Sequence, residues 1–153
     1  MSLTVFLDAG PLGMITNPKK SPATTVIVQW AFDLEAAGHW LIVPAMADYE
    51  VRRELVRAEK AEGTACLNAF NSAVPGRFLS VTDEALLIGA DLWARARNTG
   101  TTTADPKELN ADVLIAGQAL ATGLPPSEFI IATLNVGHLA LFVPAELWSK
   151  IQP

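Results

Sequence analysis

The sequence contains very little of what builds a disulfide or a zinc site. Among its 153 residues there are one cysteine, Cys66, and two histidines, His39 and His138, which lie far apart. A single thiol excludes an internal disulfide and any zinc cage built from cysteines. Cys66 lies among helix-forming residues without a basic neighbour, so we expect a small buried side chain there rather than a nucleophile.

Long apolar runs and an excess of basic residues are also absent. The longest apolar stretches, such as 129–132, are far too short to span a bilayer, and no signal-peptide pattern opens the chain. We therefore expect no membrane partner and a cytoplasmic location. The 11 Lys and Arg face 16 Asp and Glu, a net charge of −5. Contact with nucleic acid would then require a local basic patch or a metal ion.

The composition is that of a folded protein with a substantial core. Half of the residues are hydrophobic and 18% are charged, which excludes a disordered chain. No repeat, low-complexity tract or linker interrupts the sequence. A chain of this length suits one domain, and we predict a single domain over residues 1–153.

Apolar segments of two kinds alternate along the chain, separated by Pro and Gly. Short apolar runs predict strands at 5–7, 39–43, 78–81, 128–132 and 139–143. Helical spacing and capping residues predict helices at 21–38, 45–60, 62–73, 82–98, 110–121 and 145–151, with a polar loop at 99–108. This alternation predicts an α/β fold with a mostly parallel sheet of about five strands flanked by helices.

Four polar side chains follow the ends of predicted strands or begin predicted helices. Asp8 ends the first strand, Glu50 lies in the first turns of the helix after the second, and Asp112 lies near the start of the helix after the polar loop. Asn135 follows the strand 128–132. Ligands of parallel sheets gather beyond the carboxyl ends of the strands. Three carboxylates and an amide oxygen suit Mg²⁺ or Mn²⁺.

Each of these residues also has an ordinary structural interpretation. Asp8 precedes residues 10–13, whose Gly and Pro are expected to form a turn that Asp8 caps. Glu50 fits a solvated helix face, Asp48 is a weaker alternative to it, and Asp112 fits a charge at a helix start. Only their joint placement at the ends of successive strands and at the starts of the following helices favours a shared site.

Four segments of the chain resemble the signature blocks of PIN domains. They are, in the family's order, "VFLDAGPLG", "LIVPAMADYEVRREL", "ADPKELNADVLIAGQAL" and "FIIATLNVGHL". The similarity is greatest to the VapC-type toxins of bacterial toxin–antitoxin pairs and covers nearly the whole chain, including the terminal "FVPAELW". It implies a three-layer PIN-like fold and a metal-dependent endoribonuclease, dimeric and held inactive by a cognate antitoxin protein.

The resemblance also implies roles for the acidic residues. The family's acidic positions fall on Asp8, Glu50 and Asp112. We expect Asp8 and Asp112 to hold Mg²⁺ or Mn²⁺, with Glu50 binding directly or through water. A metal held in this way lowers the pKa of a bound water, which attacks a phosphodiester of the RNA substrate.

The fourth acidic position of the family departs from the pattern. Many members have Asp where this chain has Asn135, and Thr133 matches the hydroxyl residue beside it. An amide oxygen brings no negative charge, so we expect weak occupancy of one of two metal sites, or a one-metal enzyme in which Asp105 compensates. The alternative is a catalytically weakened PIN-fold module that binds RNA or a protein.

Basic residues near the first two blocks are candidates for weak contacts with RNA phosphates. They are Arg52, Arg53, Arg57, Lys19 and Lys20. Pairing of the arginines with the acidic residues at 54, 59 and 62 is an equally good interpretation. Other phosphate enzymes fit less well: Gly10 occupies the place of the second Asp of a haloacid-dehalogenase-type phosphatase, and "GPLG" matches no Gly-rich nucleotide loop.

Overall fold

The computed structural model describes residues 2–100 and 106–153. Its centre is a five-stranded sheet in the order β3-β2-β1-β4-β5, and every neighbouring pair of strands is parallel. The strands are β1 (Thr4–Leu7), β2 (Trp40–Pro44), β3 (Phe78–Leu79), β4 (Phe129–Thr133) and β5 (Ala145–Leu147). The predicted α/β architecture is confirmed.

The central strand β1 explains why the chain begins with an apolar run. Val5, Phe6 and Leu7 are at most 1% exposed, and β1 pairs with β2 on one side and with β4 on the other. A parallel strand covered on both faces has no solvent side and therefore shows no polar alternation. Asp8 directly follows β1 and therefore lies beyond the carboxyl end of the central strand of the sheet.

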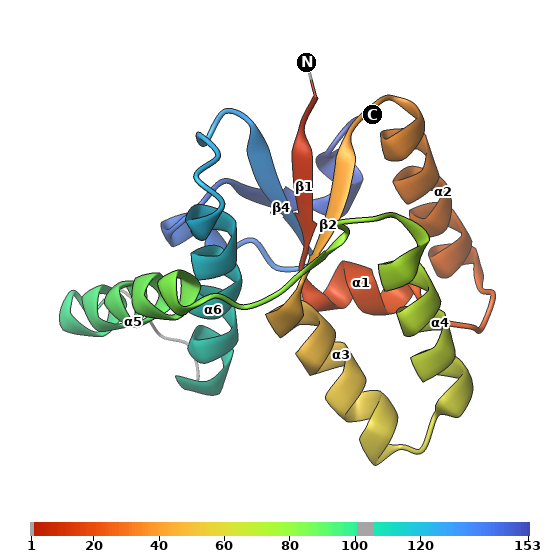
Figure 1. The fold of residues 1–153 in the computed structure, drawn as a ribbon, viewed down its shortest axis with the longest axis horizontal. Helices are drawn as coiled ribbons and strands as arrows, with labels where there is room; N and C mark the ends of the chain where they lie inside the picture. Colours follow the sequence, from red (N-terminus) through yellow and green to blue (C-terminus); the bar gives the residue numbers. More distant parts are fainter. Residues whose placement is uncertain (1, 101–105) are drawn as a thin grey trace.

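Six α-helices in the described part of the chain surround this sheet. They are α1 (Ala9–Ile15), α2 (Pro22–Ala36), α3 (Ala45–Arg57), α4 (Ala61–Ala73), α5 (Asp83–Asn98) and α6 (Pro106–Ala121). Figure 1 shows α2 on one side of the strands, α5 and α6 on the other, and α1 and α3 beyond the strands' carboxyl ends. Among the described residues, no helix combines the length and apolar character needed to cross a membrane.

Local capping chemistry explains the start of α2. The Ser21 hydroxyl accepts a hydrogen bond from the Thr24 amide at 3.2 Å, and the Thr24 hydroxyl accepts one from the Ser21 amide at 2.9 Å. This reciprocal pair satisfies two amides that the first turn leaves without partners, and Pro22 follows at the first helical position. The predicted helix start is confirmed.

The residues after Asp8 form a helix, and the predicted turn over residues 10–13 is wrong. Asp8 has extended backbone angles and caps α1 by accepting a hydrogen bond from the Ala9 amide at 2.8 Å. Pro11 lies in the first turn, where a helix needs no donor from it. A Cβ at Gly10 would lie 2.6 Å from the Leu134 side chain, so a larger residue there would require this exposed side chain to move.

The C-terminal elements also differ from the prediction. The expected strand 139–143 is a short 3-10 helix, η1 (Leu139–Leu141), and the expected helix 145–151 consists of β5 followed by η2 (Trp148–Lys150). Ala145 pairs with Ile131, so β5 completes the edge of the sheet next to β4. Apolar runs this short fit a strand and a helix equally well, and pairing with β4 decides between them.

Two helix boundaries shift by a few residues. The helix predicted over 45–60 ends at Arg57, because Glu59 takes a left-handed backbone conformation with φ of 54°. The helix predicted over 110–121 begins earlier, at Pro106, a residue suited to a first turn. The earlier start places Asp112 within α6, six residues after its first residue.

Candidate functional site

The four polar residues expected at the sheet ends line one cavity. Asp8, Glu50, Asp112 and Asn135 surround a space of about 180 Å³, together with Ala9, Gly10, Ala111 and His138. These residues come from the end of β1, from α3, from α6 and from the loop after β4. The structure therefore brings together residues that are up to 127 positions apart in the sequence (Asp8 to Asn135).

Asp8 is held in place through both of its carboxylate oxygens. Oδ1 accepts a hydrogen bond from the Ala9 amide at 2.8 Å, and Oδ2 accepts one from the Thr133 hydroxyl at 2.7 Å. Thr133 is 1% exposed, and its Oγ1 also accepts a hydrogen bond from the Asn135 amide at 3.1 Å. Thr133 thus joins Asp8 to the loop that carries Asn135.

Glu50 lies where its negative charge is unfavourable. Burial raises the pKa of the Glu50 carboxyl above its usual value, and the negative charge of Asp8 raises this pKa further. Arg53, whose Nη2 is 4.0 Å from Glu50 Oε2, lowers it only in part. Two carboxylates that repel each other in a partly buried cavity form an environment that a cation stabilises.

The donor set suits a hydrated cation with oxygen ligands. Among the residues that the structure describes, no group of three or more Asp, Glu, His or Cys lies close enough together to hold a metal ion by itself. The cavity of about 180 Å³ has room for several waters of about 30 Å³ each. Mg²⁺ keeps several of its waters and binds through one or two carboxylates, so this geometry fits it.

His138 also lines the cavity, a place that the sequence patterns did not predict for it. It is half-buried and lies three residues after Asn135, directly before η1. The sequence feature that could have indicated His138 as a site residue is its place in the block "FIIATLNVGHL". Asn135 is exposed, and its Oδ1 accepts a hydrogen bond from the Gly137 amide at 3.2 Å. Asp105, the expected compensating carboxylate, lies outside the described residues.

Asp48, the weaker alternative to Glu50, does not line the cavity but belongs to a buried hydrogen-bond network. Its carboxylate accepts hydrogen bonds from Arg52 Nε at 2.9 Å and from Arg52 Nη2 at 3.0 Å. Asn71 Nδ2 in α4 donates a third, at 2.8 Å. Asp48 therefore joins α3 to α4, and the guanidinium of Arg52 is occupied by this pairing.

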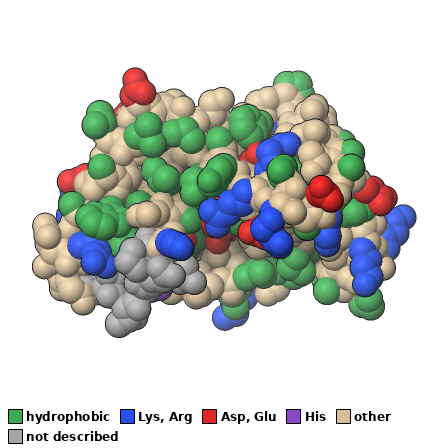
Figure 2. Space-filling view, turned by 90° about the horizontal axis from the view of Figure 1, so that it is seen from below, with side chains coloured by type: hydrophobic (Ala, Val, Ile, Leu, Met, Phe, Trp, Pro, Cys, Tyr) green, Lys and Arg blue, Asp and Glu red, His purple; other side chains and the backbone are tan. Residues whose placement is uncertain are grey.

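The remaining basic candidates lie in mixed surroundings. Arg53 pairs with Glu50, and Arg57 Nε donates to Glu54 Oε2 at 2.8 Å. Lys19 and Lys20 are exposed. Figure 2, which views the molecule from the side of the strands' carboxyl ends, shows acidic and basic side chains next to one another near the centre. Contact of these basic residues with RNA stays a prediction.

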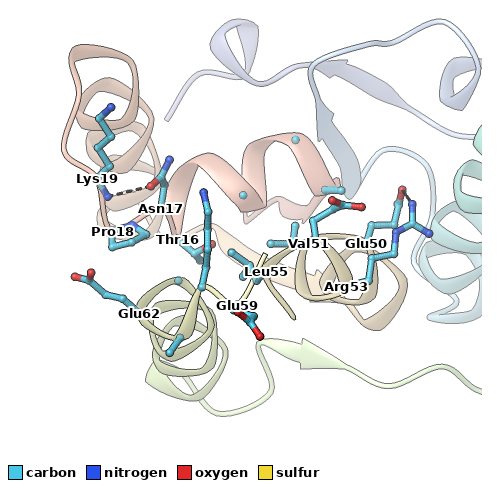
Figure 3. Close-up of a pocket in the computed structure, with 17 residues that line it drawn as sticks. Thr16, Asn17, Pro18, Lys19, Glu50, Val51, Arg53, Leu55, Glu59 and Glu62 are labelled. Atoms are coloured by element: carbon cyan, nitrogen blue, oxygen red, sulfur yellow. Dashed lines mark hydrogen bonds and ion pairs between the residues drawn. The ribbon is translucent and has the colours of Figure 1, made fainter. Parts of the chain in front are cut away.

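A larger groove adjoins the acidic cavity. It has a volume of about 840 Å³ and shares Ala9, Gly10 and Glu50 with that cavity. Its walls come from α1, from the following loop with Lys19, and from the facing parts of α3 and α4 (Figure 3). The small and apolar residues on its lining include Gly13, Val51, Leu55 and Gly63.

The fold is shared with chains of solved VapBC and FitAB structures. A chain of the Rickettsia felis VapBC2 complex bound to a DNA fragment from their promoter matches at a TM-score of 0.70 and 16% identity, over 95% of this chain and 99% of that one. FitAcB from Neisseria gonorrhoeae matches at a TM-score of 0.67 and 20% identity, over 96% of this chain and 99% of that one. DNA-bound VapBC from Salmonella typhimurium matches at a TM-score of 0.66 and 18% identity, over 95% of this chain and 98% of that one.

These likenesses concern the fold. No protein-family model and no curated protein matches the sequence. At identities of 16–20%, the shared feature is the arrangement of strands and helices over nearly the full length of both chains. The resemblance to VapC-type PIN toxins inferred from the sequence blocks is thereby confirmed at the level of the fold.

Proposed function

We propose that this protein is a metal-dependent endoribonuclease and the toxin of a toxin–antitoxin pair. The observation that carries the proposal is the acidic cavity, which Asp8, Glu50 and Asp112 line together and in which the charge of Asp8 raises the pKa of Glu50. The cavity lies at the carboxyl edge of a parallel sheet, the usual place for a ligand in this architecture. The fold shared with chains of VapBC and FitAB complexes supports the toxin role.

The chain's own residues have distinct parts in this proposal. Asp8 and Asp112, with Glu50, would hold Mg²⁺ or Mn²⁺. The bound ion supplies a water acidified for attack on an RNA phosphodiester. The hydrogen bonds from Ala9 and Thr133 orient Asp8, and each of its oxygens keeps a lone pair for the cavity. Asn135 contributes a neutral oxygen.

The proposed partners are an RNA substrate, a cognate antitoxin protein and a second copy of the chain, in the cytoplasm. The net charge of −5 opposes RNA binding, and neutralisation of the cavity's carboxylates by a cation reduces this opposition locally. The likeness of this chain to chains of the VapBC and FitAB complexes supports the proposal of an antitoxin partner. Sedimentation of the purified chain, alone and with its antitoxin, tests both assemblies.

Cleavage of RNA by the purified chain tests the activity directly. We expect cleavage with Mg²⁺ or Mn²⁺, none with EDTA, and none from Asp8→Asn under either condition. Asp91→Asn is the matched control, because Asp91 is an exposed carboxylate on α5 that pairs with Arg95, away from the cavity. Equal cleavage by Asp8→Asn and wild type would refute the assignment.

A second candidate function is a PIN-fold module that binds RNA or a protein without cleaving it. Asn135 favours it, because an amide brings no charge, and so does the spacing of the carboxylates among the described residues. Such a module would bind RNA equally well with and without EDTA and would release no product.

Asn135→Asp should increase Mn²⁺ affinity if Asn135 faces the metal, as measured by calorimetry.

A further inference from the structure

One buried polar side chain joins the two helices that carry Glu50 and Asp112. Gln118 in α6 is 2% exposed. Its Oε1 accepts a hydrogen bond from the Met46 amide at 3.0 Å, and its Nε2 donates one to the Leu79 carbonyl at 2.9 Å. Both ends of the amide are therefore satisfied, by α3 on one side and by the end of β3 on the other.

The start of α3 explains why this side chain is needed. The first amides of a helix have no partner within the helix and are usually satisfied by a side chain at the N-cap. The N-cap of α3 is Pro44, which makes no side-chain hydrogen bond. A buried amide without a partner is costly, and Gln118 supplies the missing acceptor from another helix.

This bridge lies close to the acidic cavity along both helices. Met46 precedes Glu50 by four residues, about 6 Å along the axis of α3, and lies on the same helix face. Asp112 precedes Gln118 by six residues, about 9 Å along α6. A displacement of α3 relative to α6 at the bridge would therefore move Glu50 relative to Asp112.

We infer that Gln118 is a positioning residue that sets the spacing of Glu50 and Asp112 by holding the start of α3 to α6. The inference rests on the proposed function for its consequence in metal binding, but the bridge itself is independent of the metal. Groups that hydrogen-bond directly to metal ligands typically change metal affinity 10- to 100-fold when they are removed, and Gln118 acts through the backbone of α3, so we expect an effect at the lower end of this range. A role limited to stability would leave the affinity of the folded protein unchanged.

The test compares Gln118→Met with Ile115→Val. Methionine nearly preserves the volume of glutamine and removes both hydrogen bonds. Ile115→Val removes one buried methylene from the same helix, where Ile115 is 0% exposed, and breaks no hydrogen bond. Mn²⁺ affinity is measured by calorimetry on protein shown to be folded by circular dichroism. We expect a loss of about tenfold in Gln118→Met and no change in Ile115→Val.

A second measurement needs no metal. Spin labels at the exposed positions Glu54 in α3 and Asn110 in α6, with Cys66 replaced by Ser, report the distance between the helices by double electron–electron resonance. We expect a broader or shifted distance distribution in Gln118→Met and the wild-type distribution in Ile115→Val. If Gln118→Met does not fold, Gln118→Asn, which keeps the amide but is too short to reach both partners, takes its place.

The outcomes separate this inference from the proposed function. Unchanged Mn²⁺ affinity and unchanged distances in the Gln118 variant would overturn the inference while wild-type cleavage stands. Equal loss of Mn²⁺ affinity in Ile115→Val would overturn it as well, because the effect would then follow from core packing alone. If the wild type binds no Mn²⁺ but the distances change only in the Gln118 variant, the bridge is supported and the metal-dependent function is refuted.

Discussion

Thr133 donates a hydrogen bond to Asp8 Oδ2 across 2.7 Å, although the two residues are 125 positions apart in the sequence. Thr133 ends β4 and Asp8 follows β1, and these two strands are neighbours in the sheet. The parallel register thus places the hydroxyl and the carboxylate at the same edge. This contact ties the orientation of Asp8 to the loop after β4.

Thr133→Val should therefore weaken both the site and the fold. Valine keeps the shape of threonine and loses the hydrogen bond to a charged group, at a cost of about 2 kcal/mol in the free energy of unfolding. We expect Mn²⁺ affinity to fall about tenfold, because Asp8 loses the group that orients it. Thr133→Ser keeps the hydroxyl and is the control. Wild-type Mn²⁺ affinity in Thr133→Val would show that the hydrogen bond has no part in binding.

Glu50→Gln should stabilise the metal-free protein near neutral pH. The pKa of Glu50 is raised in the folded state, so its ionised form destabilises that state, and stability is lost as the pH rises through the folded pKa. Gln carries no charge and removes this loss. Urea unfolding in EDTA should show a higher free energy of unfolding for Glu50→Gln than for wild type at pH 7. This difference should disappear below about pH 4, where the Glu50 carboxyl of the wild type is protonated in the folded and the unfolded state. A gain that is independent of pH would refute the explanation.

Arg52→Ala should destabilise the fold by about 2 kcal/mol, because it removes two hydrogen bonds to the carboxylate of Asp48, whose side chain is 9% exposed. The matched control is Arg57→Ala. Arg57 and Glu54 form a pair whose side chains are 72% and 61% exposed, and such pairs contribute less than about 0.5 kcal/mol. Urea denaturation of both variants measures the difference. Equal stabilities would mean that the Asp48 network does not strengthen α3.

Gly117→Ala should destabilise the packing of α5 on α6 by about 1–3 kcal/mol. A Cβ at Gly117 would lie 2.5 Å from the Ala85 carbonyl oxygen and 3.2 Å from the Gly89 amide, both of them backbone atoms of α5. Gly13→Ala, within α1, is the control, because the nearest atom to its Cβ would be 3.8 Å away. In Gly13→Ala, the better helix propensity of alanine should stabilise the protein by about 0.5–1 kcal/mol. Thermal unfolding of both variants checks the opposite signs.

The sequence was sufficient wherever local chemistry acts within a few residues. The buried run of β1, the Ser21–Thr24 pair and the alternation of strands with helices each follow from residue type and spacing. The placement of Asp8, Glu50 and Asp112 on one cavity also followed, because parallel strands bring their carboxyl ends to one edge. For these features the physical cause lies in the local sequence or in a general property of parallel sheets.

Other features depend on partners that are distant in the sequence. Gly10 lies against the side chain of Leu134, and β5 is a strand because β4 offers it an edge. The contact between Gln118 and Met46 joins residues 72 positions apart. By itself the sequence determined the α/β fold and the acidic residues at the edge of its sheet. Only the tertiary structure decided how those residues are held, because a buried hydrogen bond is specified by both of its partners.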